Sequence, residues 1–514
     1  MKLVWFKRDL RVYDNAALCI AAQNGPILPL YIFEPELWRQ PDMSHRHFLF
    51  LLENLRELHA ALDHLGQPLI VKIGEVVPIL KDLINRYSIT EVYSHQETWN
   101  EWTYQRDVQV GEYLKKKNVP WHQPVQNGVI RRLRDRNRWS HRWYQTMSQV
   151  LIVPPKRLFF IGESSDPWPM PEDFGLQRDG CHQRQIGGRQ AGLLLLKTFL
   201  QERGLHYQKA MSSPVTAFKQ CSRLSAHIAF GTLSLREIFQ STETQFLFLK
   251  KKSSLKLPLL DPLECLSWKR SLRSFSGRLR WHCHFIQKLE DDPRLEKENM
   301  HSAYNSIRQD SWDVKKYQAW ATGKTGYPFI DACMRALIAT GWINFRMRAM
   351  LLSFASQHLW LDWRYTATHL ARLFIDYEPG IHYSQCQMQS GTTGMNTLRI
   401  YNPIKQSYDH DPEGGFIRRW VPELKEVPLS YLHEPWNSPI PLHYPYPLVE
   451  EKTARLKAAT TLYELRRSHQ HHQEKIVLIK KHASRKKLIP KKSVKNKLKK
   501  AQPIDKNQLN FYFH

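Results

Sequence analysis

The first 125 residues alternate short apolar runs with amphipathic stretches, and this alternation limits the possible fold more than any other feature. Five apolar runs have the length of β-strands: Lys2–Phe6, Ile27–Phe33, Leu69–Ile73, Glu91–Ser94 and a short run near Val119. Between them, His47–Leu65 and Val77–Tyr87 repeat apolar residues at helical spacing. Strands that alternate with helices form βαβ units, whose right-handed crossovers place helices on both faces of a parallel sheet. We therefore predict an α/β domain over residues 1–125.

The rest of the chain divides into three parts by pattern. Residues 126–190 lack periodicity and are rich in Pro and Arg, which is typical of a long interdomain linker over the surface. Residues 191–450 show helical patterns without strand alternation, so we predict an all-helical domain there. Residues 451–514 include a helical pattern over Lys452–Arg467, but the remainder is too charged and too poor in aromatic residues to fold alone. We predict that 451–514 is a basic, largely disordered tail.

The charge favours a polyanionic partner. The chain carries a net charge of +27, and residues 451–514 contribute 18 Lys and Arg against 4 Asp and Glu, which leaves +13 for the first 450 residues. A basic body indicates nucleic acid before an acidic membrane. The tail is either a solvated segment or a DNA-binding arm or targeting signal.

The sequence contains no membrane span and no secretory signal that we recognise. No apolar run approaches the roughly 18 residues that a membrane helix requires. Met1 and Lys2 lead directly into a strand-like run, which is too short for a secretory signal. We expect a protein without membrane contact that is cytoplasmic and nucleoid-associated, or nuclear in a eukaryote.

The seven cysteines are scattered and none forms a C-x-x-C pair, which argues against a disulfide framework and a cysteine metal site. His282-Cys283-His284 has metal-ligand composition, but neighbours in sequence point in different directions on a helix or a strand. We predict no metal site.

A predicted helix in the segment 311–348 lies between basic and aromatic residues. The pair Tyr327-Pro328 precedes it and Gly341 follows it. Its apolar residues recur at helical spacing: Ile330, Met334, Leu337 and Ile338. Spacing alone describes a buried helix with a solvated basic end, and it names no ligand.

This segment resembles the flavin-binding region of the DNA photolyase/cryptochrome family. Three other segments resemble the family in the same order: VWFKRDLRVYDNAAL at 4–18, SRLSAHIAFGTLS from Ser222, and YNPIKQSYDHDPEGGFIRRWVPEL from Tyr401. The resemblance runs from Met1 to about Leu424. It implies an α/β antenna domain, a linker and an all-helical FAD-binding domain, in which reduced FAD passes an electron to a DNA lesion under light.

The resemblance implies a role in FAD binding for eight residues: Tyr207, Ser222, Leu224, Ser225, Arg348, Asp376, Glu378 and His382. Hydroxyls and backbone N–H groups near a helix start suit phosphates, although an ordinary N-cap has the same composition. Arg348 and Asp376 are expected to pair, because each alone would be an unpaired buried charge. A structural salt bridge accounts for this pair equally well.

The resemblance also implies DNA-binding and electron-transfer residues. Arg278, Trp281 and Trp342 correspond to the region around the family's lesion pocket, where aromatic walls stack flipped bases. Core packing is the alternative for any one of 17 tryptophans. Trp363 matches the middle and Trp312 the outer member of the family's chain of three tryptophans.

The innermost position of that chain is Cys386, and a thiol cannot replace an indole there. Tyr383 and Trp360 are alternative aromatic residues.

Three further positions bear on the subtype. Asn100-Glu101 resembles a segment that holds a folate antenna, so a second chromophore of folate or deazaflavin type is expected. Arg278 stands where cyclobutane-dimer enzymes carry a glutamate. His382 stands where an asparagine or aspartate faces the flavin, and we predict that its charge changes near neutral pH and that it donates a proton.

Phe345 and Ala349 replace the two histidines of animal-type (6-4) enzymes. We predict a monomeric, light-driven photolyase that repairs pyrimidine photoproducts in damaged DNA. The alternatives are a cryptochrome-type photoreceptor without repair activity and a DNA-binding protein without flavin.

Overall fold

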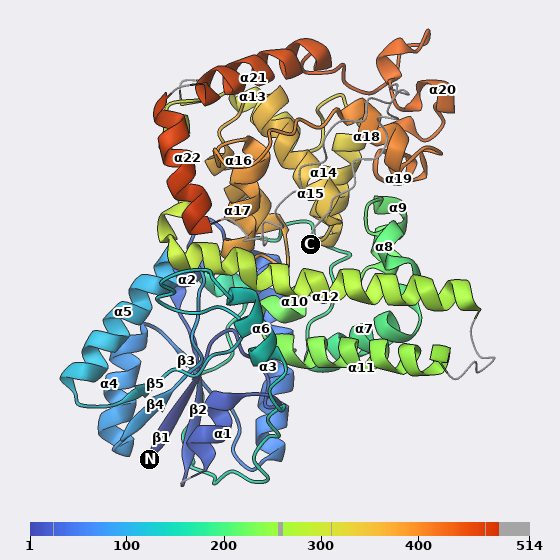
Figure 1. The fold of residues 1–514 in the computed structure, drawn as a ribbon. Coiled ribbons are helices and arrows are strands. Elements are labelled where there is room, and N and C mark those ends of the chain that lie inside the picture. Colours follow the sequence, from blue (N-terminus) through green and yellow to red (C-terminus); the bar gives the residue numbers. More distant parts are fainter. Residues whose placement is uncertain (24, 255–260, 310, 468, 483–514) are drawn as a thin grey trace, which may run out of the picture.

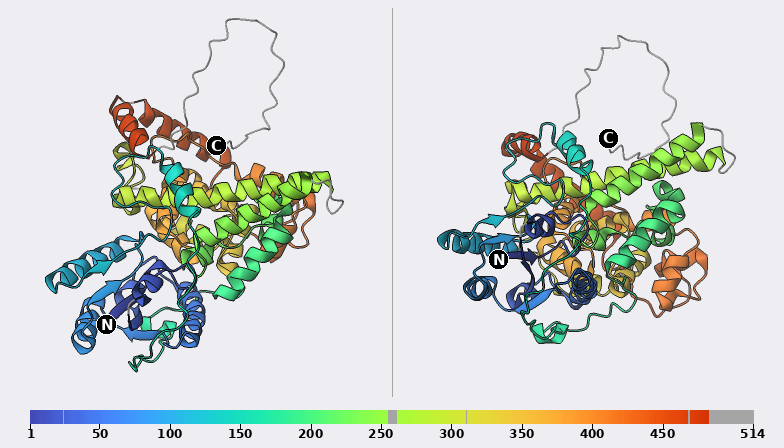
Figure 2. Two further views of the ribbon diagram at one scale, coloured as in Figure 1. Left: turned by 60° about the horizontal axis from the view of Figure 1, so that its bottom comes forward. Right: turned by 90° about the horizontal axis from the view of Figure 1, so that it is seen from below.

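The structure is a computed structural model and describes residues 1–23, 25–254, 261–309, 311–467 and 469–482. An α/β domain forms one lobe, and a larger helical domain packs on it (Figures 1 and 2). The five strands are all parallel and lie in the order β3-β2-β1-β4-β5. Their bounds are Lys2–Phe6 (β1), Ile27–Phe33 (β2), Ile70–Ile73 (β3), Glu91–Tyr93 (β4) and Trp121–His122 (β5). The predicted fold class is confirmed.

Helices cover both faces of the sheet, as the right-handed crossovers predict. They are α1 (Ala16–Ala22), α2 (Pro35–Trp38), α3 (His45–His64), α4 (Val76–Tyr87) and α5 (Glu101–Lys116). Alternate residues of β1 enter different cores, because successive side chains of a strand point to opposite faces. Leu3 and Trp5 belong to the core under α4 and α5, while Val4 and Phe6 belong to the core shared with α3.

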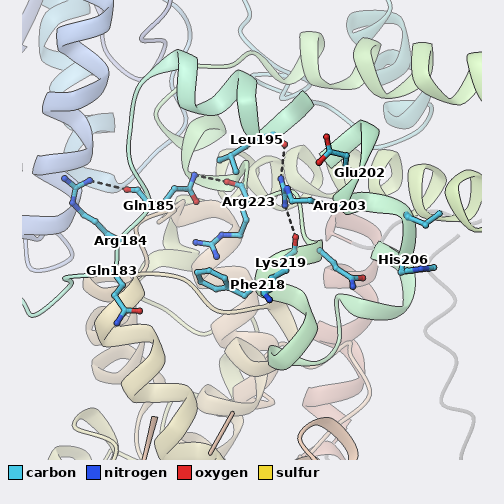
Figure 3. Close-up of a pocket in the computed structure, with 12 residues that line it drawn as sticks. Gln183, Arg184, Gln185, Leu195, Glu202, Arg203, His206, Phe218, Lys219 and Arg223 are labelled. Atoms are coloured by element: carbon cyan, nitrogen blue, oxygen red, sulfur yellow. Dashed lines mark hydrogen bonds between the residues drawn. The ribbon is translucent and has the colours of Figure 1, made fainter. Parts of the chain in front are cut away.

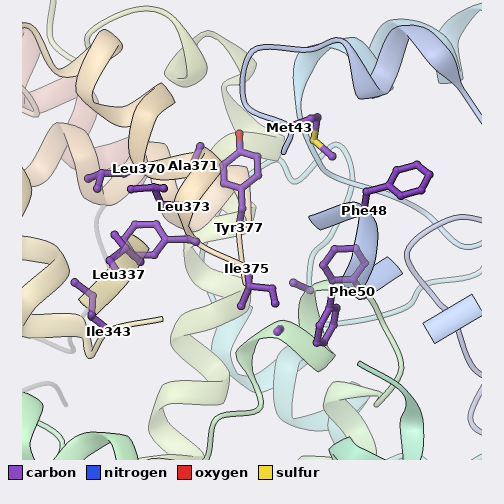
Figure 4. Close-up of a cluster of buried hydrophobic side chains, with 14 of the residues drawn as sticks. Met43, Phe48, Phe50, Leu337, Ile343, Leu370, Ala371, Leu373, Ile375 and Tyr377 are labelled. Carbon is purple, nitrogen blue, oxygen red and sulfur yellow. The ribbon is translucent and has the colours of Figure 1, made fainter. Parts of the chain in front are cut away.

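The two domains share one hydrophobic core. Figure 4 shows Phe48 and Phe50 of α3 on one side and Ile375 and Tyr377 of the helical domain on the other. Arg46, also on α3, is fully buried and donates to the carbonyl oxygen of Leu373 at 2.8 Å. The interface therefore has the character of a protein interior, which fixes the two domains relative to each other.

The segment 126–190 contains two elements that we did not predict, the helix α6 (Trp139–Met147) and the 3₁₀ turn η1 (Pro171–Phe174). Trp143 of α6 is fully buried, with its ring 5.2 Å from that of Phe239. A Cβ on Gly128 would lie 2.0 Å from the Trp143 ring, so the chain approaches this indole closely. A nine-residue helix offers too few turns for periodicity to be recognised.

The remaining described elements up to residue 450 are helical. They are α7 (Arg189–Gln201), η2 (Arg203–His206), α8 (Tyr207–Ala210), α9 (Pro214–Gln220), α10 (Ser225–Ala229), α11 (Leu235–Ser254), α12 (Pro262–Asp291), η3 (Pro293–Glu296), η4 (Ser302–Tyr304), α13 (Val314–Ala321), α14 (Pro328–Thr340), α15 (Phe345–Ser353), the π-helix η5 (Phe354–His358), α16 (Trp363–Leu373), α17 (Pro379–Ser390), α18 (Pro403–His410), α19 (Gly415–Trp420), η6 (Pro422–Leu424), α20 (Leu429–Leu432) and η7 (Pro435–Asn437). The 30-residue α12 crosses the helical domain and packs against α11 and α17.

The predicted helix after Tyr327-Pro328 is α14. Pro328 occupies its first turn, where a missing N–H costs nothing. Gly341 ends the helix in the left-handed conformation, with φ of 71°.

The C-terminal segment is more ordered than predicted. Helices α21 (Glu451–Arg466) and α22 (His469–His482) lie against the body of the protein. The helical pattern predicted over Lys452–Arg467 is confirmed as α21, whereas the prediction of a largely disordered tail is wrong for α22. Helix α22 makes polar and apolar contacts: His471 stacks on His301 at 4.2 Å, Lys481 pairs with Asp292 at 2.8 Å, and the buried Leu478 joins a small apolar cluster. Composition hid this docking because it depends on individual polar partners rather than on an apolar stripe. The rest of the predicted tail, residues 483–514, lies outside the described residues.

Within the described ranges, every helix is too short or too polar to cross a lipid bilayer.

Candidate functional site

An arginine–carboxylate pair stands at the centre of the helical domain. Arg348 of α15 donates through Nη1 and Nη2 to the two carboxylate oxygens of Asp376, each at 2.9 Å. Burial raises the pKa of the Asp376 carboxyl, but Arg348 and Ser225 outweigh burial and leave it below its usual value. The predicted pairing is confirmed, and Ser225 at the start of α10 lies beside it.

The Ser222–Ser225 segment and Tyr207 lie close to this pair. Leu224 is buried just before α10, and Arg278 of α12 hydrogen-bonds with the side chain of Tyr207. Burial raises the pKa of the Tyr207 hydroxyl, so this group stays protonated. Tyr207, Ser225, Arg348 and Asp376 come from four separate segments that the fold brings into one region.

This region carries an excess of positive charge. Burial raises the pKa of the Cys221 thiol to about 12, and four arginines act against that rise. They are Arg223, Arg203, Arg278 and Arg348. Such a concentration of guanidinium groups favours an anionic ligand such as a pyrophosphate.

Several buried polar atoms near the pair have no hydrogen-bond partner among the described residues. They are Oε1 of Glu378, both amide atoms of Gln385 and Nδ1 of His282. Buried polar groups are normally hydrogen-bonded, so these atoms fit a polar ligand between α12 and α17. Burial also raises the pKa of Glu378 to about 7, although Arg8 acts to lower it.

His282 and Gln385 were not predicted as site residues. Gln385 lies three residues after His382 and seven after Glu378, which is one face of a helix, and this spacing was a usable signal. His282 was recognised only as part of a chance metal-like triplet. The structure finds no group of metal-ligating side chains within the described ranges.

His382 differs from the prediction. Its Nε2 lies 2.8 Å from the carbonyl oxygen of Ala367 and 3.6 Å from Sγ of Cys386. Burial lowers the pKa of His382 to about 4, so it is neutral at pH 7 and its charge does not change near neutral pH. A proton on Nε2 is donated to the Ala367 carbonyl, which argues against the predicted role as a proton donor.

The predicted electron-transfer residues have different surroundings. Trp363 is fully buried, its indole N–H donates to Oδ1 of Asn299 at 2.7 Å, and its ring lies 6.3 Å from Tyr383. Trp312 is 40% exposed and packs on Tyr365 at 4.5 Å. Of the two alternatives to Cys386, Tyr383 therefore contacts Trp363.

Trp360, the other alternative, stacks with the guanidinium of Arg308 at 4.4 Å.

The predicted DNA-binding residues have different environments. Trp281 on α12 is half-buried and makes an edge contact with His284 at 4.7 Å. Trp342 is only 8% exposed, with the Arg223 guanidinium 4.1 Å from its ring. Trp342 thus packs against Arg223 and Phe218 in this structure, which differs from the predicted position facing DNA.

Phe345, the first residue of α15, is 43% exposed, and the Arg278 guanidinium lies 5.9 Å from its ring. It offers the accessible aromatic surface that Trp342 does not.

The predicted antenna residues make structural contacts. Asn100 caps α5 by accepting from the Thr103 N–H at 3.1 Å, and it also donates to Asp42. Glu101 forms an ion pair with Lys297 of the helical domain.

The strand order reverses between β1 and β4, and such switch points commonly form ligand clefts. Here the cleft has a volume of only about 40 Å³. Arg106 occupies it and pairs with Glu34 at 2.7 Å and Glu97 at 2.5 Å.

Comparison with known proteins agrees with this geometry. Residues 2–149 match the DNA photolyase family and residues 275–464 match the FAD-binding domain of DNA photolyase. The chain is 30% identical to deoxyribodipyrimidine photo-lyase of Escherichia coli, over 88% of this chain and 97% of that protein. It is 27% identical to cryptochrome-2 of Arabidopsis thaliana, over 88% of this chain and 77% of that protein.

Among solved structures, it resembles an archaeal photolyase from Sulfolobus tokodaii with two FAD molecules. The TM-score is 0.72 at 25% identity, and the match covers 90% of this chain and all of the other.

The fold and the site together define a two-domain flavoprotein with a helical FAD-binding domain. The chain belongs to the DNA photolyase/cryptochrome family. It is a photolyase-like enzyme whose cofactor is FAD, and the unpartnered buried polar atoms and clustered arginines fit that cofactor.

Proposed function

We propose that this protein is a light-driven DNA photolyase that splits pyrimidine photoproducts, either cyclobutane dimers or (6-4) products. The observation that carries the proposal is the Arg348–Asp376 pair, which lies beside unpartnered buried polar atoms and an excess of arginine. A basic body supplies the attraction to DNA.

FAD, when bound, supplies light absorption and the electron for cleavage. Ser222, Leu224 and Ser225 would hold its phosphates, and Tyr207, whose hydroxyl stays protonated, would contribute to the same binding region. Arg348, held by Asp376, presents a fixed cation. Such fixed charges stabilise an anionic state without reorganisation.

Glu378 and His382 complete the enclosure. With a pKa of about 7, Glu378 can donate or accept a hydrogen bond at Oε1 near neutral pH. His382 is neutral and buried, so it excludes water without adding charge.

Arg278, Trp281 and Phe345 form the entrance for DNA in this proposal. Arg278 and Phe345 lie 5.9 Å apart, which places a cation and an aromatic face together. A base that has left the duplex regains stacking on such a face, worth roughly 1–3 kcal/mol. The basic surface contacts phosphates, so affinity is expected to fall as salt rises.

The direct test is illumination of ultraviolet-damaged duplex DNA with the reduced, flavin-loaded protein. Cyclobutane dimers and (6-4) products are counted separately, with a dark sample as the control. We expect one lesion class to disappear only in the light. Persistence of both classes contradicts the repair proposal.

A cryptochrome-type photoreceptor is the second candidate, and the polar docking of α22 favours it. The hydroxyl of Tyr304 and Nε2 of His471 share a hydrogen bond of 3.0 Å, and the backbone N–H of Ser302 donates to the Glu474 carboxylate at 2.9 Å. Such contacts are weaker than an apolar interface and suit a releasable segment. Light-dependent protease cutting beyond residue 450, without loss of any lesion, would select this function.

We further propose that the protein acts as a monomer on damaged DNA, in the nucleoid of a cytoplasm or in a nucleus. A second chromophore of folate or deazaflavin type is also proposed, and the archaeal relative with two FAD molecules supports a second pigment in such folds. Its binding in the switch-point cleft requires Arg106 to move. The absorption spectrum of the purified protein reports both pigments.

A further inference from the structure

A cavity of about 660 Å³ opens between the end of the segment 126–190 and helices α7 and α9 (Figure 3). Residues 183–185, the turn η2, the C-terminal part of α9 and Arg223 form its wall. None of the residues predicted to bind flavin lines it. Its volume is in the range of small-molecule sites.

Arg223 is the most unusual residue in this wall. It is only 7% exposed, and its backbone has the left-handed φ of 62°. Its Nε is buried without a partner, and the largest charge that stabilises its cation is that of Asp376, which already forms two hydrogen bonds with Arg348. It instead stacks 4.1 Å from each of the Phe218 and Trp342 rings.

Burial lowers the pKa of Arg223 to about 10, so the side chain still carries its charge at neutral pH. A buried cation whose stabilising carboxylate, Asp376, is already hydrogen-bonded to Arg348 is costly, and an anionic ligand offsets that cost.

The other cations of the wall have different roles. Arg184 pairs with Glu53, and Arg203 donates to the carbonyl oxygens of Cys221 at 2.6 Å and Leu195 at 2.9 Å. Lys219 is exposed at the edge of the cavity. Arg223 and Lys219 therefore remain as the pair that can receive an anion.

Two amide oxygens of the wall also lack hydrogen-bond donors, which a ligand could supply. Oε1 of Gln185 and Oε1 of Gln220 are buried without partners, while Nε2 of Gln185 donates to the carbonyl of Arg223 at 2.9 Å. An oxygen of this kind accepts from an N–H group. Phe218 is 45% exposed, so a planar ring can stack on it.

We propose that this cavity binds a nucleoside phosphate. The phosphate contacts Arg223 and Lys219, the base stacks on Phe218, and its amino group donates to the amide oxygen of Gln185 or Gln220. The proposal does not depend on repair activity, because none of the eight residues predicted to bind flavin lines the cavity. The cavity and the Arg348–Asp376 region are neighbours, since Arg223 and Arg203 line the cavity and also act on Cys221 together with Arg348.

The test is isothermal titration of the flavin-loaded protein with AMP, with adenosine and inorganic phosphate as partial ligands. We expect one AMP per chain, bound at least 10-fold more tightly than either partial ligand. Arg223→Gln and Phe218→Ala should each weaken AMP binding at least 10-fold, and Lys219→Gln a few-fold. Lys209→Gln is the matched control, since Lys209 is an exposed lysine of α8 outside the cavity.

Equal AMP binding by the wild type and both Arg223→Gln and Phe218→Ala would overturn the proposal, as would no AMP binding at millimolar concentration. Phosphate alone binding as tightly as AMP also overturns it. Flavin absorbance is recorded for each variant. Loss of flavin is then distinguished from loss of AMP, and Phe218→Ala, at an exposed position, keeps the test valid if Arg223→Gln fails to hold flavin.

Discussion

The switch-point cleft of the α/β domain and the Arg348–Asp376 region of the helical domain are both buried and polar, yet they satisfy their polar groups differently. In the cleft, Arg106 pairs with Glu34 and Glu97, and Lys7 pairs with Asp107 at 2.9 Å. The charged groups of the cleft are thus paired within the chain itself, while the indole N–H of Trp99 in its wall has no partner among the described residues.

In the helical domain, Glu378, Gln385 and His282 retain buried atoms without partners among the described residues. A fold can tolerate such atoms where a ligand supplies the partners. The contrast lies in the charged and amide groups: those of the cleft form ion pairs within the chain, whereas Glu378 and Gln385 keep buried atoms without partners.

The largest effect is expected from Arg106→Ala in the cleft. The substitution leaves Glu34 and Glu97 buried without their cation, which costs about 3–5 kcal/mol of unfolding free energy. Urea denaturation measures this loss. Flavin absorbance per folded chain should stay unchanged, and a parallel loss of flavin would break the distinction between the two regions.

The second prediction concerns the buried His382 of the helical domain. The α/β domain also contains a buried histidine, His95, but that one contacts a carboxylate, Asp9, at 2.6 Å. The pKa of His382 is lowered from 6.5 in the unfolded chain to about 4 in the folded protein, so the folded protein binds this proton only at a lower pH. Stability is therefore unaffected above pH 6.5 and falls by about 1.4 kcal/mol per pH unit between pH 6.5 and 4.

Other buried histidines with lowered pKa add to the same decline: His47, His227, His282 and His369. His382→Gln should remove one histidine's share, on the order of 3 kcal/mol at pH 4 relative to pH 7. Denaturation curves of the variant and the wild type across this range check the prediction. If the unfolding free energy of the variant depended on pH as steeply as that of the wild type, His382 would be solvated rather than buried.

The smallest effect compares two glutamines whose amide atoms are buried. Gln385→Leu removes amide atoms that have no partner, so the flavin-free protein should gain about 1 kcal/mol, while flavin binding weakens. Gln287→Leu is the matched control, because Gln287 is fully buried and bonds to the Ile130 backbone on both sides of its amide. That change should cost about 1–3 kcal/mol.

Thermal denaturation of flavin-free protein measures both variants. If both Gln385→Leu and Gln287→Leu changed the stability of the flavin-free protein in the same direction, there would be no basis for treating Gln385 as part of a ligand site.

Much of the fold was predictable because local sequence patterns determine its strands and helices. Strand β1 and helix α14 have the bounds that their apolar periodicity and the Pro328 and Gly341 signals indicate. Helix α6 and the docking of α22 were not predictable, since a short helix lacks periodicity and α22 depends on contacts such as Lys481–Asp292.

The sequence predicted which residues lie in the site, but not their protonation states or hydrogen bonds. Resemblance indicated Arg348 and Asp376, and the structure shows their two hydrogen bonds. It did not indicate the neutral state of His382 or the unpartnered amide of Gln385, because a pKa and a hydrogen bond depend on neighbours from other segments.

The sequence by itself determined the parallel sheet, the helical flavin domain and the basic charge, since each follows from local periodicity, matched motifs or composition. Only the tertiary structure decided which polar groups were left without partners and that Trp342 lies buried under Arg223. The physical reason is that desolvation and pairing are set by segments that lie far apart in the chain and meet only after folding.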